Sequence, residues 1–458
     1  MSPVTPSLAG GKATDLRTVT LAASVGSIAE YFDWGVAAPI AALVWPTIFF
    51  PGLNPAEAVA ASLATFGVVY LTRPLGAYVF GRFGDKNGRK KGLTWTLVLM
   101  GMGSFGLSLA PGYATIGATA PILLILLRVA QGLGHGGEWG GASTWVSESA
   151  AESKRRSFWT GWVTFAAPAG NLLASLSFFW LSSTMPRADF FSYGWRLLFV
   201  SGAAVALAGL LIRWRFTESP MFARKEELRQ PELRDPGFLR SEWKRVTVLT
   251  LSFMCLSLTV GVLTSTFALN YLTKLGASPS GATLYAWIAR VPGLFAFVAG
   301  AFIGDFKGRL LTLRVGTLAL IPSVLLFFPL VNINSFLPIL VAFILIEVPV
   351  NFASGSVAAL FTESFPTRHR NRGAGMSYHT GALVHGLVLT LLLPAIISYS
   401  GGVLNSALPV AFMLVSFVAV SLLASFKVSE TRTLMVADRR LESMIGPPGI
   451  ARTNHGKD

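Results

Sequence analysis

Gly81-Arg82-Phe83-Gly84-Asp85-Lys86-Asn87-Gly88-Arg89-Lys90-Lys91 is the stretch that decides the fold of this chain. A weaker copy, Gly304-Asp305-Phe306-Lys307-Gly308-Arg309, follows 220 residues later, and both copies lie between long apolar segments. Soluble repeats have periods of roughly 20 to 50 residues. A period of 220 residues instead indicates that the chain consists of two similar helical halves. The sequence therefore predicts a duplicated membrane bundle with a charged loop at matching places, which is typical of secondary transporters.

The composition agrees with a membrane protein. The chain has 458 residues, of which 52% are hydrophobic and only 13% are charged, whereas a soluble globular chain carries about 25% charged residues. The net charge of +15 comes from Lys and Arg in short loops between apolar runs, so we expect no nucleic-acid partner. The single cysteine, Cys255, excludes an intrachain disulfide. Residues 1–19 lack the apolar core of a cleavable signal peptide, so we expect the first apolar run to remain as a helix.

Twelve apolar segments are long enough to cross about 30 Å of hydrocarbon. We therefore predict an all-α membrane protein with twelve transmembrane helices in two six-helix bundles. The predicted parts are an N-tail (1–19), an N-terminal bundle (20–216), a polar linker (217–244), a C-terminal bundle (245–427) and a C-tail (428–458). The predicted helices are 20–49, 57–81, 92–110, 119–148, 157–183, 194–216, 245–270, 281–304, 311–331, 336–362, 373–399 and 404–427.

The distribution of positive charge predicts the orientation in the membrane. If the N-terminus is cytoplasmic, the inside loops and tails collect nearly all of the 37 Lys and Arg residues, and the outside loops hold only Arg187 and Lys274. Both termini are then expected to be cytoplasmic, which requires an even number of helices. The multi-pass chain is expected to act as a monomer.

Four arginines fall inside the helices or at their ends: Arg73, Arg128, Arg196 and Arg290. Arg196 is expected to be an interfacial anchor. A charge at mid-bilayer costs about 2.5–3.5 kcal/mol on insertion scales. The other three therefore need a partner, water or a functional role.

Several polar residues lie on shared helix faces. Glu30 and Asp33 are three residues apart in the first helix and cannot both face lipid. In the fourth helix Arg128, Gln131, His135 and Glu138 form one polar face, beside glycines at positions 132, 136 and 140 that allow close helix approach. Glu347, Asn351 and Ser354 share a face of the tenth helix. His379 and His385 lie on different faces of the eleventh, so we expect at most one to line a central cavity.

These residues carry a family resemblance. Residues 81–91 and the run Arg128-Val129-Ala130-Gln131-Gly132 resemble motifs of the major facilitator superfamily. Further runs resemble its metabolite:proton symporters, which include carriers of α-ketoglutarate, citrate, shikimate and proline or betaine. The helix 1 aromatic order differs from that family's, and His135 stands where a small or hydroxyl residue is common. The matching runs are Glu30-Tyr31-Phe32-Asp33-Trp34, Arg73-Pro74-Leu75-Gly76, residues 131–142, Glu148, Arg155-Arg156, Glu218-Ser219-Pro220 and Phe365-Pro366-Thr367-Arg368.

The resemblance implies a twelve-helix, two-bundle carrier in the plasma (inner) membrane of a prokaryote, with a central site reached alternately from each side. It places Asp85 and Arg89 in a cytoplasmic gate, with Asp305 and Arg309 as a lesser version. Such a gate consists of charge-assisted hydrogen bonds that hold the outward-open form and break on switching. Glu148 resembles part of a second clamp, with Arg155 and Arg156 as its partners.

The driving force is expected to be a proton gradient. The chain lacks the P-loop pattern, and its two G-x-G-x-x-G strings lie inside apolar helices, where they are packing glycines. No motif indicates a cofactor, a metal site or enzymatic chemistry. A carboxyl in a low-dielectric site can change charge near neutral pH. We expect the proton carrier among Glu30, Asp33 and Glu138, preferably Glu30 or Asp33, with Arg128 beside it. The alternative is that one acid only neutralises Arg73 or Arg128.

The predicted substrate is a small molecule that bears a carboxylate. Arg73 and Arg290 come from opposite halves, and arginine binds carboxylates through two parallel hydrogen bonds. A carrier of a zwitterion such as betaine or proline is the second interpretation, and a non-transporting membrane receptor or enzyme is the third. The other expected substrate contacts are Tyr70, Glu138, Trp139, Glu347, Asn351 and His385.

Overall fold

The structure is a computed structural model, which describes residues 16–215, 218 and 237–433. All regular elements within these residues are helical. The N-terminal half contains α1 (Leu16–Leu43), α2 (Trp45–Phe49), α3 (Pro55–Asn87), α4 (Arg89–Leu109), α5 (Tyr113–Ile116), α6 (Thr119–Ser149), α7 (Arg156–Thr184), α8 (Arg187–Asp189), the π-helical η1 (Phe190–Gly194) and α9 (Trp195–Trp214).

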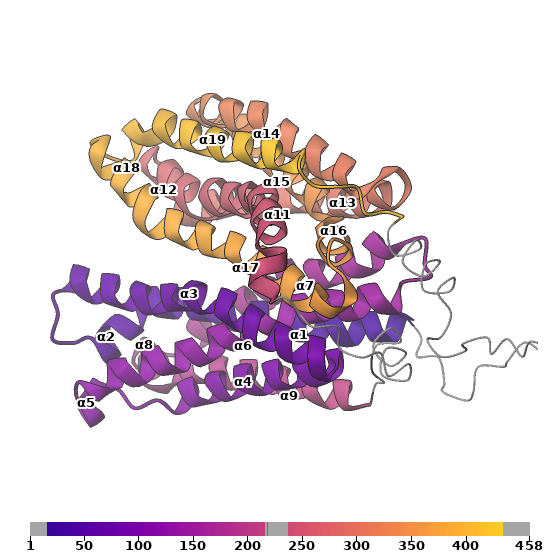
Figure 1. Cartoon of the computed structure of the whole chain (residues 1–458). Helices are drawn as coiled ribbons and strands as arrows, with labels where there is room; N and C mark the ends of the chain where they lie inside the picture. The colour runs from indigo at the N-terminus through magenta and orange to yellow at the C-terminus, as the bar shows by residue number, and fades with distance from the viewer. Residues whose placement is uncertain (1–15, 216–217, 219–236, 434–458) are drawn as a thin grey trace, which may run out of the picture.

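The C-terminal half repeats this plan. Its elements are α11 (Phe238–Val260), η2 (Gly261–Thr266), α12 (Phe267–Lys274), α13 (Pro279–Lys307), α14 (Arg309–Asn332), α15 (Phe336–Ser354), α16 (Val357–Glu363), η3 (Thr367–His369), α17 (Arg370–Leu387), η4 (Val388–Leu392), α18 (Leu393–Tyr399), η5 (Leu404–Ser406) and α19 (Ala407–Ser425). In Figure 1 the first half is the lower group of helices and the second half is the upper group.

Twelve helical segments of the described chain correspond to the twelve predicted spans. Ten of them are long and apolar enough to cross a membrane by composition alone. The remaining two, α1 and α6, have 28 and 31 residues and carry most of the buried ionisable groups of the N-terminal half. Their polar residues lower the mean hydropathy, although the helices are long enough to span.

The predicted linker 217–244 is too long at its C-terminal end. Helix α11 begins at Phe238, and its first turns are polar, which hid the start of the helix from a hydropathy reading. Residues 219–236 of the linker and most of both predicted tails lie outside the described residues. The described part of the C-tail, up to residue 433, packs against the helices through Glu430 and Arg432.

The predicted glycine rows bring α3 and α6 into close contact. A Cβ added at Gly136 would overlap the carbonyl oxygen of Arg73, and one added at Gly132 would overlap the Thr72 hydroxyl. A further member of the row, Gly140, faces Gly375 of the other half, where an added Cβ would lie 2.7 Å from the Gly375 Cα. Small residues therefore permit close approach within the N-terminal bundle and also between the two bundles.

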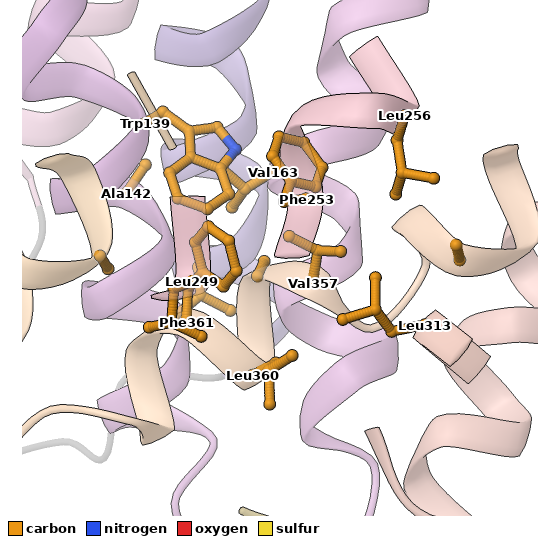
Figure 2. Packing of buried hydrophobic residues seen from close by; sticks show 14 of the residues in the cluster. Trp139, Ala142, Val163, Leu249, Phe253, Leu256, Leu313, Val357, Leu360 and Phe361 are labelled. Carbon is orange, nitrogen blue, oxygen red and sulfur yellow. The ribbon is translucent and has the colours of Figure 1, made fainter. Parts of the chain in front are cut away.

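An apolar cluster joins the two halves (Figure 2). Trp139 and Val163 come from the N-terminal half, and Phe253, Val357 and Phe361 come from the C-terminal half. The Trp139 and Phe361 rings meet edge to face, with centroids 6.2 Å apart. The halves are thus in packed contact in this conformation, and the polar residues described next lie beside that contact.

Candidate functional site

Asp33 of α1 is held inside the N-terminal bundle. Its carboxylate accepts hydrogen bonds of 2.5 Å from both the Ser104 hydroxyl and the Gln131 amide. The Gln131 side-chain oxygen in turn accepts a 2.7 Å bond from Arg128, whose guanidinium lies over the Trp45 ring. Asp33 is therefore connected to Arg128 through Gln131, as the shared face on the fourth predicted helix indicated.

Glu30 lies one helical turn away and has a different partner. Its carboxylate is completely buried and is 3.5 Å from the Arg73 guanidinium of α3. Among the described residues neither carboxylate oxygen accepts a hydrogen bond. The charge of Glu30 is thus balanced by one loose ion pair, whereas Asp33 is fully hydrogen-bonded.

His135 of α6 lies between these two acids. Arg73 approaches the His135 Nδ1 at 3.3 Å, and the opposite ring nitrogen, Nε2, is 3.6 Å from the Asp33 carboxylate. Because a guanidinium can only donate, Nδ1 is the acceptor and the ring proton is on Nε2, directed at Asp33. We call Glu30, Asp33, Arg73, Arg128, Gln131 and His135 the central polar cluster.

The C-terminal half reaches this cluster through α17. The Tyr378 hydroxyl is 2.9 Å from the Tyr31 hydroxyl, and the Tyr378 ring stacks on Trp139 with centroids 3.9 Å apart. Further along α17, the His385 ring contacts Tyr70 edge to face at 6.1 Å. His379 is completely buried and lies within electrostatic range of Arg73. Both histidines therefore lie within electrostatic range of Arg73, and that at most one of them lines a central cavity stays a prediction.

The second predicted arginine has an acid of its own. Arg290 of α13 lies over the Trp287 ring and is electrostatically coupled to Glu347 of α15. The Glu347 carboxylate also accepts hydrogen bonds from Thr264 at 3.1 Å and from Asn351 at 2.9 Å. Arg73 and Arg290 each have an acidic neighbour within their own half.

Glu138 has a cationic partner of its own on α9. Its carboxylate is completely buried and pairs with Arg213, and it also accepts a 2.8 Å bond from Thr96. Arg213 is itself fully buried in α9. Glu138 also lies within electrostatic range of Glu30, so it adjoins the central polar cluster while Arg213 balances its charge.

Asp85 and Arg89, which the sequence predicts to form a gate, pair at one end of the bundles. We call this end the basic end and this set of contacts the first gate. The two side chains are 2.7 Å apart, and Asp85 also accepts backbone N–H bonds from Asn371 and Arg372 at the start of α17. Arg89 donates to the Thr367 carbonyl oxygen across the same boundary at 2.7 Å. The predicted gate residues therefore join the two halves directly.

Glu148 belongs to this gate, but its partners are Arg89 and Arg370 and not Arg155. Arg155 is exposed at the surface and lies over the Phe302 ring. Its neighbour Arg156 is buried and pairs with Glu363 at 2.6 Å. The predicted clamp of Glu148 with Arg155 and Arg156 was therefore wrong, because Glu148 pairs with neither. The chain enters α7 at residue 156 and turns that side chain toward Glu363.

The second gate is as complete as the first. Asp305 accepts backbone N–H bonds from Ser157 and Phe158 at the start of α7, at 2.8 and 3.0 Å. Arg309 pairs with both Asp305 and Glu363. In each gate, an Asp and an Arg come from one half of the chain, and the Asp accepts backbone hydrogen bonds at the start of a helix in the other half.

Sequence reasoning did not identify four residues as members of the gates. They are Glu363, Arg370, and the two glutamates that cap the starts of α4 and α14, Glu218 and Glu430. Glu218 accepts from the backbone of Arg89 and Lys90, and Glu430 accepts from that of Arg309 and Leu310. The signal was present, because Thr217-Glu218-Ser219 has an echo in Ser429-Glu430-Thr431, as Glu148 has in Glu363. The two repeats were compared at Asp85 and Arg89 with Asp305 and Arg309, but not at these further positions.

Comparison with known proteins identifies the family. The chain matches the Major Facilitator Superfamily model over residues 23–390. It is 35% identical over 376 residues to the inner membrane metabolite transport protein YhjE of Escherichia coli K12, covering 80% of this chain and 84% of that one. It is 32% identical to the shikimate transporter of the same strain, covering 92% and 94%.

Two further matches concern substrate range and fold. The proline/betaine transporter of Salmonella typhimurium LT2 is 32% identical, over 82% of this chain and 77% of that protein. The structure of the proton:xylose symporter XylE bound to 6-bromo-6-deoxy-D-glucose superposes with a TM-score of 0.74, at 17% identity, over 93% of this chain and 99% of that one. The predicted two-bundle fold is confirmed, and the predicted absence of enzymatic function agrees with these relatives. This chain is a member of the major facilitator superfamily, a secondary transporter of metabolites.

Proposed function

We propose that the chain is a proton-coupled symporter of a small carboxylate-bearing metabolite, and that it works by alternating access. The observation that carries this proposal is the Glu30–Arg73 ion pair, buried in the bundle with no other hydrogen bond to the Glu30 carboxylate among the described residues. A buried acid with a single, loose partner is suited to change its charge. A buried arginine beside it is suited to receive a carboxylate from the substrate.

Coupling follows from competition for Arg73. While Glu30 is ionised, it neutralises the guanidinium, so a second carboxylate finds no net positive charge there and is repelled by Glu30 itself. Protonation of Glu30 removes that competition, so the substrate carboxylate takes its place beside Arg73. Proton and substrate then favour each other's binding, and the reciprocity of linkage requires both effects to be equal. Asp33, hydrogen-bonded by Ser104 and Gln131, stays the second candidate for the proton site, with Arg128 as its distant cation.

Alternating access uses the gates at the basic end. We propose that this end faces the cytoplasm, because the loops and tails there hold most of the Lys and Arg residues. The formed gates then correspond to a carrier closed toward the cytoplasm. Switching must break the contacts of Asp85, Glu148, Arg156 and Asp305 with the opposite half. The location proposed for the carrier is the inner membrane of a prokaryote, where it acts as a monomer.

The remaining substrate contacts are proposed from both halves. Tyr70 of the N-terminal half and His385 of the C-terminal half contact each other through their rings, and Arg73 lies over the Tyr70 ring. Arg290, Glu347 and Asn351 form the group on the C-terminal side. Trp139 stacks on Tyr378, so it contributes to closing the site from the basic end. Glu138 is left out because Arg213 already neutralises it.

A zwitterionic substrate is the second candidate, and one observation favours it. Because Glu347 is coupled to Arg290, the C-terminal side offers no net positive charge for a second carboxylate. A betaine or amino acid needs only one carboxylate site, and its cation is suited to an acid or to aromatic faces. Among the relatives, one is a shikimate transporter and another is a proline/betaine transporter.

Uptake by proteoliposomes separates the two candidates. Radiolabelled organic acids, proline and betaine are offered with and without an inward proton gradient, and the membrane potential is set independently with valinomycin and potassium. A monoanion carried with one proton is expected to accumulate with the pH gradient alone and to ignore the potential. A zwitterion carried with one proton responds to the potential as well. Accumulation that needs neither gradient would refute proton coupling.

A further inference from the structure

His379 of α17, in the C-terminal half, has the features of a ligand-binding side chain. Its side chain is 0% exposed, yet neither ring nitrogen has a hydrogen-bond partner among the described residues. Buried polar atoms are nearly always hydrogen-bonded, and an unmade bond costs more than a made bond contributes. A histidine with both nitrogens unmet at the boundary of two bundles therefore indicates a polar group that it binds during the transport cycle.

The surroundings of His379 belong to both halves. Arg73 and His135 of the N-terminal half are within electrostatic range of its ring. The preceding residue, Tyr378, is fixed by the Tyr31 hydroxyl and by stacking on Trp139. This anchoring fixes the register of α17, which packs against α3, the helix that carries Arg73.

Other atoms of the cluster are unmet as well. Among the described residues, the Nε of Arg73 has no hydrogen-bond acceptor, and both carboxylate oxygens of Glu30 have no donor. Unmet donors and acceptors thus lie on α1, α3 and α17, and α1 and α17 each pack against α3, which is how a polar substrate site is built.

We infer that His379 binds a hydroxyl group of the substrate, next to the carboxylate that Arg73 binds. A neutral imidazole presents one N–H donor and one acceptor nitrogen. A hydroxyl group matches both, since it donates and accepts, whereas a carboxylate only accepts and leaves one ring nitrogen unmet. The substrate class assigned is therefore a hydroxy acid. This inference rests on the proposed function and deepens it.

The contact also links substrate binding to the change of conformation. Arg73 is on α3 and His379 is on α17, which pack against each other across the boundary between the halves. A hydroxy acid that bridges these two side chains stabilises the closed boundary more than an acid without the hydroxyl does. The hydroxyl is then expected to affect both affinity and the rate of closure.

Two matched pairs of acids test the assignment: shikimate with cyclohex-1-ene-carboxylate, and lactate with propionate. Binding to the purified full-length protein is measured by titration calorimetry, and uptake is measured in proteoliposomes under a pH gradient. Wild type is expected to bind the hydroxylated member of at least one pair about tenfold or more tightly than its deoxy counterpart. His379→Phe should remove that difference between the two members of a pair, and His379→Asn or His379→Gln should restore part of it.

Gel filtration and thermal unfolding in detergent check that the His379→Phe protein folds. If that variant fails to fold, the wild-type preference and the two amide variants still decide the question. A wild type without hydroxyl preference in either pair, or a His379→Phe protein that keeps the preference, overturns the inference. Uptake of both members of a pair without preference leaves proton-coupled acid transport standing, whereas uptake of no acid under a pH gradient refutes the proposed function itself.

Discussion

Asp85 and Asp305 hold equivalent positions in the two halves, and each carboxylate binds the first backbone N–H groups of a helix in the opposite half. Asp85 accepts from Asn371 and Arg372 at the start of α17, and Asp305 accepts from Ser157 and Phe158 at the start of α7. A carboxylate at a helix N-terminus meets unpaired N–H groups and a favourable dipole. The basic end is therefore held closed by two symmetric carboxylate–helix contacts.

Neutralising either aspartate should loosen the closed basic end. Asp85→Asn and Asp305→Asn each keep the side-chain shape but remove the charge, which is worth about 0.3–1 kcal/mol at a helix terminus and up to about 2 kcal/mol where it is partly buried. We expect a several-fold greater labelling of a cysteine placed at Ser147, which is buried and bonded to Thr362 of the other half.

The labelling is measured with a membrane-impermeant maleimide on inside-out vesicles, in a background with Cys255→Ser so that only the introduced thiol reacts. Lys86→Gln, an exposed change beside the same gate, is the control and should label as the parent does. Equal labelling of the Asp85→Asn, Asp305→Asn and control proteins would show that these contacts do not hold the halves together.

Arg155 and Arg156 are neighbours in sequence, but their substitutions should affect uptake to very different extents. Arg156 is buried against Glu363, so Arg156→Ala removes one of the two arginines that pair with this buried carboxylate, and Arg309 remains. The cost should therefore stay below the roughly 3–5 kcal/mol expected when a buried charge loses every partner. Arg155 is exposed, and Arg155→Ala should change little, since exposed charges contribute about 0–1 kcal/mol. Initial uptake rates should fall at least tenfold in the first variant and remain within twofold in the second. The reverse order would contradict the described gate.

The Glu138–Arg213 pair is expected to be structural. Removing one member, as in Glu138→Gln or Arg213→Met, leaves the other charge buried and should destabilise the protein by about 3–5 kcal/mol. Replacing both, Glu138→Met with Arg213→Met, should recover much of the loss, because no charge is then left unpaired. Thermal unfolding in detergent measures the stability. A double variant less stable than either single one would contradict this role.

Gly140 tests the close approach of the two halves. Gly140→Val places a side chain against Gly375 of α17 and should prevent the basic end from closing fully. We expect uptake to fall at least tenfold, with the protein still folded as judged by gel filtration. Gly67 of α3 has no neighbour within 4 Å of an added Cβ, so Gly67→Ala is the matched control and should transport normally. Normal uptake by the Gly140→Val protein would show that this contact is not needed.

The fold was predictable because periodic apolar segments and a charged repeat are properties of the sequence alone. Asp85, Arg89, Asp305 and Arg309 were identified through that repeat, and the structure places all four at the boundary between the halves. The spacing on the fourth helix also placed Gln131 and His135 on one face, and in the structure both lie against Asp33.

The failures concern partners from distant segments. Nothing local in the sequence shows that α9 delivers Arg213 to Glu138, or that Arg370 and not Arg155 reaches Glu148. These pairs depend on helix rotation and on the depth of each residue in the membrane, which short-range periodicity does not fix. Comparing the two repeats position by position would have recovered Glu363 and Glu430, since both have counterparts in the first half.

The account depends most on Glu30 as the group that takes up the proton beside Arg73. In proteoliposomes, Glu30→Gln should keep substrate exchange, in which no net proton movement is needed, and should lose accumulation driven by a pH gradient. Asp33→Asn is measured beside it, because the second acid is the alternative proton site. Loss of uphill uptake with retained exchange in the Glu30→Gln protein is the predicted result. Uphill accumulation by both the Glu30→Gln and the Asp33→Asn proteins would contradict it.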